Sequence, residues 1–417
     1  MGFADFYFKR LKDFQVKITD KPNKNLKYIV VIPCFNEFNL IETLESLKQT
    51  KKIKDSIEVI IVINSSEISS ERIKQQNIET YNETLKWVSK NETSEFRFFL
   101  LHETNLPKKF AGAGLARKIG MDQAVCRFNK IDNDKGIIVS LDADSLVKAN
   151  YFVELENHFN KKPKTNAATI YFEHLLEGVE FNDEIYNAIT TYELYLWYYK
   201  KSLEYTGFPY SFFTIGSAFV VNAKTYVKQG GMNRKQAGED FYFLHKIFPL
   251  GNCFEINSTC VYPSSRISDR VPFGTGPMVK QIINLKDKPF LTYSFKSFLE
   301  LKILFEQVES LFKIGKKQLE VVCGKFPVCL KEFLDINDFK LALEEINANS
   351  SNIKSFKKRF YNWFDAFRVL KYLNFAHDTS FNKKLLIEES KILLRRKDKK
   401  VDELNIYQML ELYRNLD

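Results

Sequence analysis

The chain has 417 residues, of which 45% are hydrophobic and 27% are charged, and its formal net charge is +10. This composition indicates a globular protein with a large core, divided into two domains. No apolar run reaches the roughly 18 residues of a membrane span, and the N-terminal sequence MGFADFYFKR lacks the apolar stretch of a signal peptide. We therefore expect a cytoplasmic protein, with its six scattered cysteines reduced.

The excess of positive charge suits three kinds of partner: phosphorylated ligands, anionic membrane surfaces and nucleic acids. No nucleic-acid-binding motif occurs, and the aromatic residues lie in apolar stretches rather than between basic residues. We therefore expect no nucleic acid partner.

The first half of the chain alternates apolar runs with helical patterns, which predicts an α/β fold with a sheet of βαβ units. In chain order, the expected strands cover residues 28–33, 57–64, 96–103, 136–141, 167–172 and 214–221. The expected helices cover residues 40–49, 70–89, 113–128, 184–205 and 239–248.

From about residue 290, Leu, Ile and Phe recur at helical spacing between Lys and Glu, which predicts a helical C-terminal region. The expected division is an N-terminal amphipathic segment at 1–26, a catalytic domain at 27–285 and a helical domain at 286–417. The N-terminal segment is aromatic and basic at helical spacing. It would either lie on a membrane surface or pack against the catalytic domain.

The sequence SLDADS, at residues 140–145, directly follows an apolar run. If the strand continued, Asp142 and Asp144 would share a face and repel one another unless a cation lay between them. A divalent metal ion is one interpretation, and a solvated turn in which one Asp caps the next helix is the other.

Other polar residues follow the expected strands, where ligands bind in open α/β sheets. Pro33 ends the first strand, and Glu37 after it could accept hydrogen bonds from a base or a ribose. Asn64 begins a polar run suited to a nucleobase edge. In the loop KKFAGAGLARKIG, the glycines allow close backbone approach and Arg117 opens a helix.

Taken together, these segments resemble the GT-A glycosyltransferases of family 2 over residues 27–280. The resemblance is carried by VVIPCFNE, INSS, AGAGLARKIGMDQA, SLDADS and GGMNRKQAGEDFYFLHKI. It implies a Rossmann-like nucleotide-diphospho-sugar transferase domain that uses Mg²⁺ or Mn²⁺ and transfers a sugar, as a hexosyltransferase, with inversion.

The resemblance also implies roles for single residues. Asp144 and Asp142 would bind the metal and the donor, Asp240 would be the general base, and Glu239 would orient the acceptor. Asn64 stands where many members of the family have an Asp that reads the base, so UDP is only the default nucleotide.

The segment SSRISDRVPFGTG has no regular pattern and carries Arg266 and Arg270, which could close over the donor diphosphate. A surface role in salt bridges is the alternative.

Two other functions remain open. A nucleotidyltransferase also places acidic metal ligands at strand ends, but it would need a glycine-rich basic first loop, which PCFNEFN lacks. A non-catalytic nucleotide-sugar-binding module would show damage to the acidic motifs, and both are intact. The acceptor could be a glycan, a lipid carrier or a small molecule, and peripheral contact with the inner face of the cell membrane is a further option.

Overall fold

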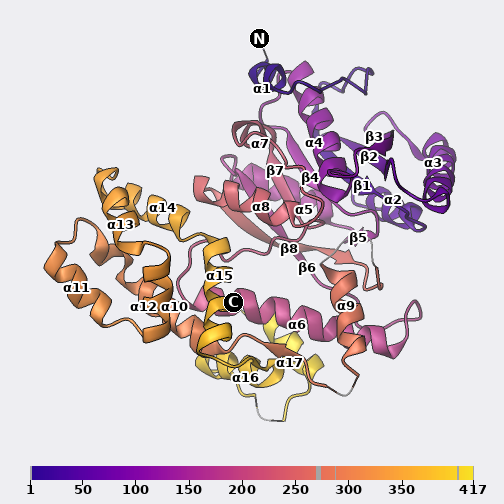
Figure 1. Ribbon diagram of the computed structural model, residues 1–417. Coiled ribbons are helices and arrows are strands. Elements are labelled where there is room, and N and C mark those ends of the chain that lie inside the picture. Colours follow the sequence, from indigo (N-terminus) through magenta and orange to yellow (C-terminus); the bar gives the residue numbers. More distant parts are fainter. Residues whose placement is uncertain (1, 269–273, 287, 402, 417) are drawn as a thin grey trace. The chain divides into compact units, whose positions relative to one another are not determined.

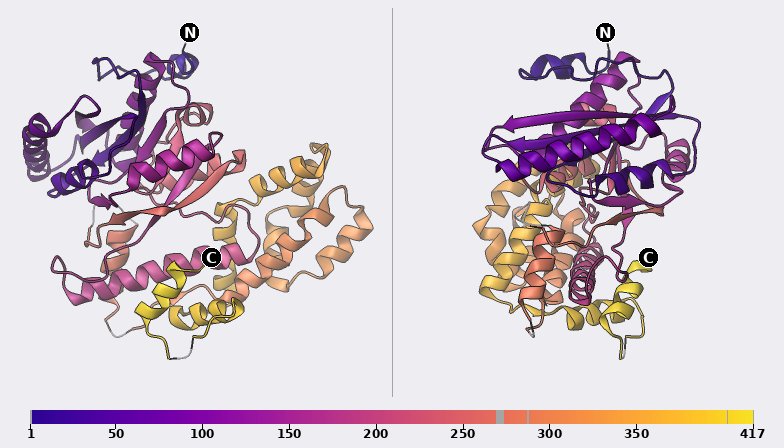
Figure 2. Two further views of the ribbon diagram at one scale, coloured as in Figure 1. Left: turned by 180° about the vertical axis from the view of Figure 1, so that it is seen from behind. Right: turned by 90° about the vertical axis from the view of Figure 1, so that its right-hand side faces the viewer.

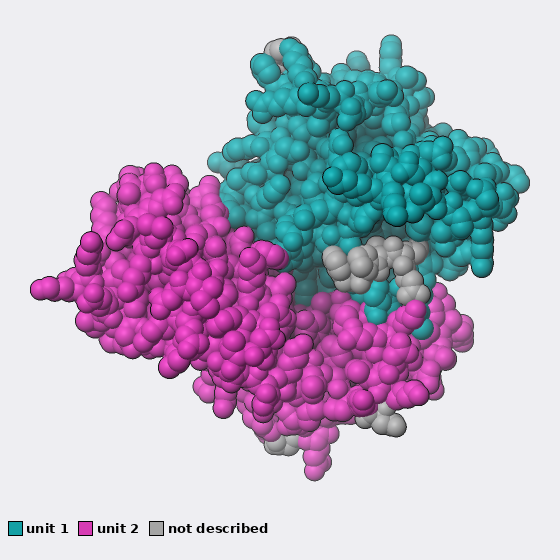
Figure 3. Space-filling model, viewed as in Figure 1, with its two compact units in different colours: residues 1–178, 213–277 teal, residues 179–212, 278–417 magenta. Residues whose placement is uncertain are grey.

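The computed structural model describes residues 2–268, 274–286, 288–401 and 403–416. It divides into two compact units, shown in different colours in Figure 3. Unit 1 consists of Met1–Gly178 and Phe213–Pro277, and unit 2 consists of Val179–Phe212 and Met278–Asp417.

Unit 1 is built on a mixed sheet of eight strands in the order β3-β2-β1-β4-β7-β6-β8-β5 (Figure 1). Strands β3, β2, β1 and β4 are parallel, and β7 runs antiparallel to β4. The bounds are β1 Leu26–Cys34, β2 Ser56–Ser66, β3 Phe96–Leu106, β4 Ile137–Ser140, β5 Ser145–Val147, β6 Ala167–Phe172, β7 Phe219–Asn222 and β8 Cys253–Pro263.

The parallel strands form from β-branched and other apolar runs that are covered on both faces. In β2, every residue from Ser56 to Ser65 is buried. Right-handed crossovers place α2 and α3 on one face of the sheet and α4 on the other. The helices of unit 1 are α1 Asp5–Arg10, α2 Leu40–Lys48, α3 Glu71–Asn91, α4 Ala113–Lys130, α5 Tyr151–Lys161, α7 Ala223–Lys228 and α8 Glu239–Ile247, followed by a short 3₁₀ turn, Phe248–Leu250.

The N-terminal segment packs along α4 (Figure 1). The Tyr7 hydroxyl donates to Asp122 Oδ1 at 2.6 Å, and the Ala4 amide donates to Asn129 Oδ1 at 2.8 Å. Tyr7 and Ala4 are both buried. Of the two arrangements expected for residues 1–26, the structure therefore has the one packed against the catalytic domain.

Unit 2 is helical, as expected for the C-terminal region, and also contains α6, whose aromatic residues pack with the later helices. The Tyr198 hydroxyl donates to the Tyr293 carbonyl at 2.8 Å, and Arg414 Nε donates to the fully buried Glu193 at 2.7 Å. The helices are α6 Asp183–Tyr205, α10 Phe295–Gln307, α11 Lys316–Gly324, α12 Val328–Ile336, α13 Phe339–Ala348, α14 Ile353–Trp363, α15 Ala366–Thr379, α16 Leu386–Arg396 and α17 Ile406–Arg414, with a 3₁₀ turn at Val308–Leu311. Helix α9, Thr275–Asn284, spans the division between the units.

The expected boundaries differ from the structure in three places. The expected catalytic domain, 27–285, includes residues 179–212, which belong to unit 2. The region after residue 290 is not helical throughout, because β9 Leu291–Thr292 pairs antiparallel with β10 Lys384–Leu385. The strand expected at 214–221 corresponds to β7, which begins only at Phe219; residues 214–218 are not part of a strand.

Before residue 286, the sequence patterns did not predict α5, α7, α9, β5 and β8. Strand β8 pairs parallel with β6 and carries the chain to Arg266. No helix in the described residues is long and apolar enough to cross a membrane.

Candidate active site

The expected site residues that the structure describes belong to unit 1, and several of them follow the carboxyl ends of its parallel strands. Strands β2, β1 and β4 are parallel neighbours, so their carboxyl ends open on the same side (Figure 2). Pro33, in register with Val62, lies at the end of β1, and Asn64 lies near the end of β2. Asp142 and Asp144 follow β4. This edge is the candidate active site.

The two aspartates do not lie on an extended strand as expected. Strand β4 ends at Ser140, and the amide of Ser145 donates to the carbonyl of Asp142 at 3.2 Å, closing a turn. Thr43 Oγ1, from α2, fixes this turn by donating to the Ala143 carbonyl at 3.0 Å. The turn directs the two carboxylates to two different arginines.

The first arginine is Arg117, in the first turns of α4. Its side chain is 2% exposed and forms ion pairs with Asp142 and Glu239. Burial opposes the charged guanidinium, but the charges of Asp142 and Glu239 outweigh it and raise the pKa of Arg117. One buried cation therefore links the D-x-D turn with the start of α8.

Asp240 lies beside this network at the beginning of α8. Burial and the neighbouring Glu239 carboxylate raise the pKa of Asp240 to about 7. Burial also raises the pKa of Glu239, although Arg117 opposes the shift. At neutral pH, Asp240 can therefore both take up and release a proton.

Gly216 packs directly against Arg117 and Asp240. A Cβ at this position would lie 2.8 Å from Arg117 Nη2 and 3.1 Å from Asp240 Oδ2. Ser140 Oγ holds this backbone in place by donating to the Gly216 carbonyl at 2.7 Å. A side chain at 216 would therefore displace either the guanidinium or the Asp240 carboxylate.

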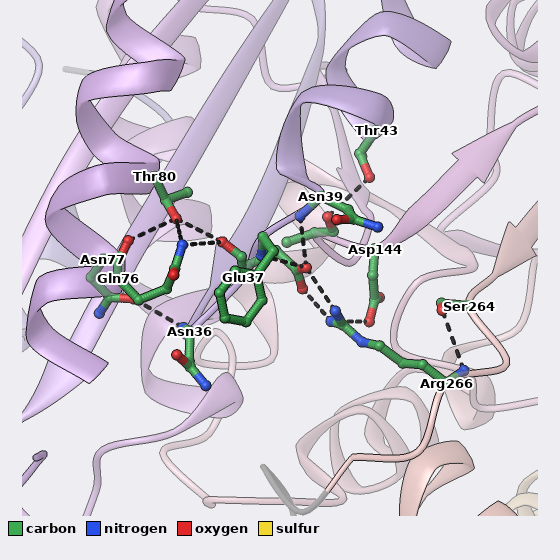
Figure 4. Close-up of polar contacts among 12 residues, drawn as sticks. Asn36, Glu37, Asn39, Thr43, Gln76, Asn77, Thr80, Asp144, Ser264 and Arg266 are labelled. Carbon is green, nitrogen blue, oxygen red and sulfur yellow. Dashed lines mark hydrogen bonds and ion pairs between the residues drawn. The ribbon is translucent and has the colours of Figure 1, made fainter. Parts of the chain in front are cut away.

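The second arginine is Arg266, which follows β8 and reaches Glu37 and Asp144 (Figure 4). Arg266 Nη1 donates to Glu37 Oε1 at 2.8 Å, and Nη2 donates to Asp144 Oδ2 at 2.7 Å and also to Glu37 Oε2. Glu37 also accepts hydrogen bonds from the amides of Phe38 and Asn39. Burial opposes the charge on Arg266, but Glu37 and Asp144 outweigh it and raise its pKa.

Two expected nucleotide contacts have internal partners in this structure. Glu37 is fully buried and its carboxylate pairs with Arg266. Asn64 is 2% exposed, and its Nδ2 donates to the Cys34 carbonyl at 2.8 Å, tying β2 to β1. Arg270 lies outside the described residues.

The donor set suits Mg²⁺ or Mn²⁺, which proteins often bind through one or two carboxylates together with phosphate oxygens. Asp142 and Asp144 supply such carboxylates, and their side chains are 38% and 21% exposed. Within the described residues, no group of three or more His, Cys, Asp or Glu side chains forms a complete metal cage. Arg266 Nη2 lies between the carboxylates of Asp144 and Glu37, so a positively charged group already occupies the space between them.

Buried polar atoms without a hydrogen-bond partner among the described residues also gather at this edge. They are Oγ of Ser65, Ser145 and Ser217 and Nε of Arg117 and Arg266. Buried polar groups normally have partners, so this cluster fits a polar ligand.

Sequence patterns did not reveal the supporting contacts from Thr43, Ser140 and Asn233. Asn233 Nδ2 donates to the Glu239 carbonyl at 2.8 Å. Thr43 and Ser140 are remote in sequence from the groups they support, and no local motif marks them. Asn233 lies six positions before Glu239, within the segment GGMNRKQAGEDFYFLHKI, but nothing in that segment shows the contact.

The mixed α/β sheet, its acidic turn after β4 and the helical C-terminal region define a GT-A nucleotide-diphospho-sugar transferase fold, as expected. Residues 29–224, a little under half of the chain, match the model of glycosyl transferase family 2. No curated protein matches the chain.

Two solved structures that resemble the chain are distant in sequence. One is TarS 1–349 of S. aureus in complex with UDP-GlcNAc, which is 15% identical, with 82% of this chain and 92% of that chain covered and a TM-score of 0.41. The other is the mannosyltransferase PcManGT from Pyrobaculum calidifontis in complex with GDP-Man and Mn²⁺. It is 14% identical, with 98% of this chain and 91% of that chain covered and a TM-score of 0.38. The family assignment rests on the family model.

Proposed function

We propose that the protein is a metal-dependent glycosyltransferase that moves a sugar from a nucleotide-diphosphate sugar to an acceptor hydroxyl with inversion. The observation that carries the proposal is the network Asp142–Arg117–Glu239, with Asp240 beside it. It joins a donor-side carboxylate to Glu239, which lies next to Asp240, whose pKa burial raises to about 7. UDP is the proposed nucleotide and a hexose the proposed sugar.

On the donor side, Asp142 and Asp144 would hold Mg²⁺ or Mn²⁺ together with the diphosphate. The bound ion supplies positive charge that stabilises the departing nucleoside diphosphate. Arg117 fixes the orientation of Asp142 through their ion pair, because the Arg117 side chain is itself buried. In this proposal, Asp142 faces the ribose or the sugar and Asp144 faces the metal.

On the acceptor side, Asp240 takes the proton from the attacking hydroxyl. A general base works best when its pKa lies near the working pH, and about 7 meets this condition. Glu239, held by Arg117, orients the acceptor. The acceptor attacks the face opposite the leaving group, and the anomeric centre inverts.

The acceptor is proposed to be a hydroxyl on a glycan, a lipid carrier or a small molecule, and the location is proposed to be cytoplasmic. Peripheral contact with the membrane would use residues other than Tyr7 and Ala4, because these are buried against α4.

A panel of nucleotide sugars, each with and without Mn²⁺, tests the proposal through the melting temperature of the purified protein. We expect a UDP-sugar to raise the melting temperature only when Mn²⁺ is present, since a ligand specific for the folded state stabilises by about 2.7 kcal/mol at 100 times its dissociation constant.

Two controls separate the alternatives. A nucleoside triphosphate that stabilises the protein more than any nucleotide sugar would indicate a nucleotidyltransferase. A nucleotide sugar that binds but never releases its nucleoside diphosphate, with acceptors of all three classes supplied, would indicate a binding module. If no nucleotide sugar stabilises the protein in the presence of Mn²⁺, the proposal is wrong.

A further inference from the structure

The two carboxylates of the D-x-D turn are neutralised in different ways. Asp142 pairs with Arg117, which is 2% exposed and fixed within α4. Asp144 pairs with Arg266, whose side chain is 22% exposed. Arg266 lies in a stretch without regular secondary structure, residues 264–268, that follows β8. Of the two arginines, Arg266 is therefore the one that can exchange its partners at low cost.

Arg266 occupies the position of a small cation rather than that of an ordinary surface residue. The single atom Nη2 contacts both Asp144 Oδ2 and Glu37 Oε2, which brings these two oxygens close to one point (Figure 4). Glu37 is fully buried, and a buried carboxylate requires a compensating charge. The guanidinium supplies that charge in this structure.

We propose that Arg266 is a resident counter-cation that competes with the divalent metal for Asp144, beside the buried Glu37. When metal and nucleotide diphosphate arrive together, the metal takes Asp144 and the phosphates become the new partner of Arg266. Metal and nucleotide then bind synergistically, and metal alone binds weakly. This inference rests on the proposed function, because it requires a metal-binding nucleotide site.

The chemistry favours such an exchange. Arginine pairs with phosphate as readily as with carboxylate, through the same planar fork. Without nucleotide, each metal ion that binds would leave the positive charge of Arg266 next to it and unpaired. With nucleotide, the diphosphate satisfies both cations at once.

The test measures Mn²⁺ binding in the absence of nucleotide, by the loss of the electron paramagnetic resonance signal of free Mn²⁺. Arg266→Met removes the charge and keeps an apolar stem. We expect this variant to bind Mn²⁺ about tenfold more tightly than the parent. This is the change expected if Arg266 occupies the carboxylates in all but about one in ten of the parent molecules, so that only this fraction is free to bind the metal. The tightening of Mn²⁺ binding caused by UDP should shrink in the variant.

The matched control is Lys148→Met, which removes the same charge from an exposed position just after β5, in the same stretch of chain as Asp144. It should bind Mn²⁺ as the parent does, so that a general charge effect is distinguished from competition. Because Arg266→Met leaves Glu37 buried without its partner, the pair Glu37→Gln and Glu37→Gln/Arg266→Met repeats the comparison without that buried charge.

The inference is overturned if the Arg266 variants bind Mn²⁺ no more tightly than their matched parents or than Lys148→Met. Failure of the proposed function gives a different pattern, in which UDP leaves Mn²⁺ binding unchanged in the parent itself.

Discussion

Asp240→Asn is expected to lower turnover by about 10² to 10⁴, the usual contribution of a general base. The amide has nearly the same size and can still accept the hydrogen bond that Asp240 receives from the Phe241 amide at 2.7 Å, but it cannot take a proton. Steady-state kinetics with a donor identified by the nucleotide-sugar panel measures the loss. Turnover of the parent should rise with pH through about 7, because only the ionised Asp240 is a base.

Asp240→Asn is also expected to change how the stability of the protein depends on pH, which loss of a helix cap alone would not do. The raised pKa of Asp240 means that its protonated form is the one favoured in the folded protein. The stability that the protonated carboxyl of Asp240 contributes to the folded protein is fully present below the unfolded-state pKa of about 3.9. It is lost as the pH rises through about 7. Asp240→Asn should therefore melt at a higher temperature than the parent at pH 8 and at nearly the same temperature at pH 4.

A matched control is Asp183→Asn, which changes an exposed acid in the first turn of α6. It should leave turnover unchanged and show no stabilisation at pH 8. If Asp240→Asn kept near-parental turnover, Asp240 would not be the general base. If the variant unfolded, the role of Asp240 would be to cap the helix.

Arg117→Met is expected to lower the free energy of unfolding by about 3–5 kcal/mol, because it leaves the buried Glu239 without its cation. It should also abolish turnover, since Asp142 and Glu239 both lose the group that orients them. Chemical denaturation and kinetics on the folded fraction measure the two effects.

Two comparisons separate stability from function. Arg127→Met breaks another buried ion pair of α4, with Glu58, and should cost similar stability while the folded protein keeps its turnover. The double variant Arg117→Met/Glu239→Gln should regain stability without regaining turnover. If Arg117→Met were as stable and as active as the parent, the linking network would have no role.

The sequence predicted the parallel strands well, because strands covered on both faces consist of continuous apolar runs, as in Val59–Ile63 of β2. Strand β8 was missed because its exposed polar residues interrupt the apolar pattern. Helix α6 was recognised as a helix, but its aromatic pattern did not show that its partners are the C-terminal helices.

The candidate site residues were chosen by motif, whereas their contacts depend on distant parts of the chain. Arg117 meets Glu239 across 122 positions, and Arg266 meets Glu37 across 229. Such pairs leave no local signal. The alternation argument for Asp142 and Asp144 failed because β4 ends two residues before Asp142 and a turn replaces the strand.

Calorimetric titration of UDP into the parent and into Asp144→Asn, each with and without Mn²⁺, tests the central claim most directly. Asp134→Asn, which removes the same charge at the other end of β4, is the control. The account predicts that UDP binding depends on Mn²⁺ in the parent and in the control and no longer depends on it in Asp144→Asn. Equal metal dependence in all three proteins would contradict it.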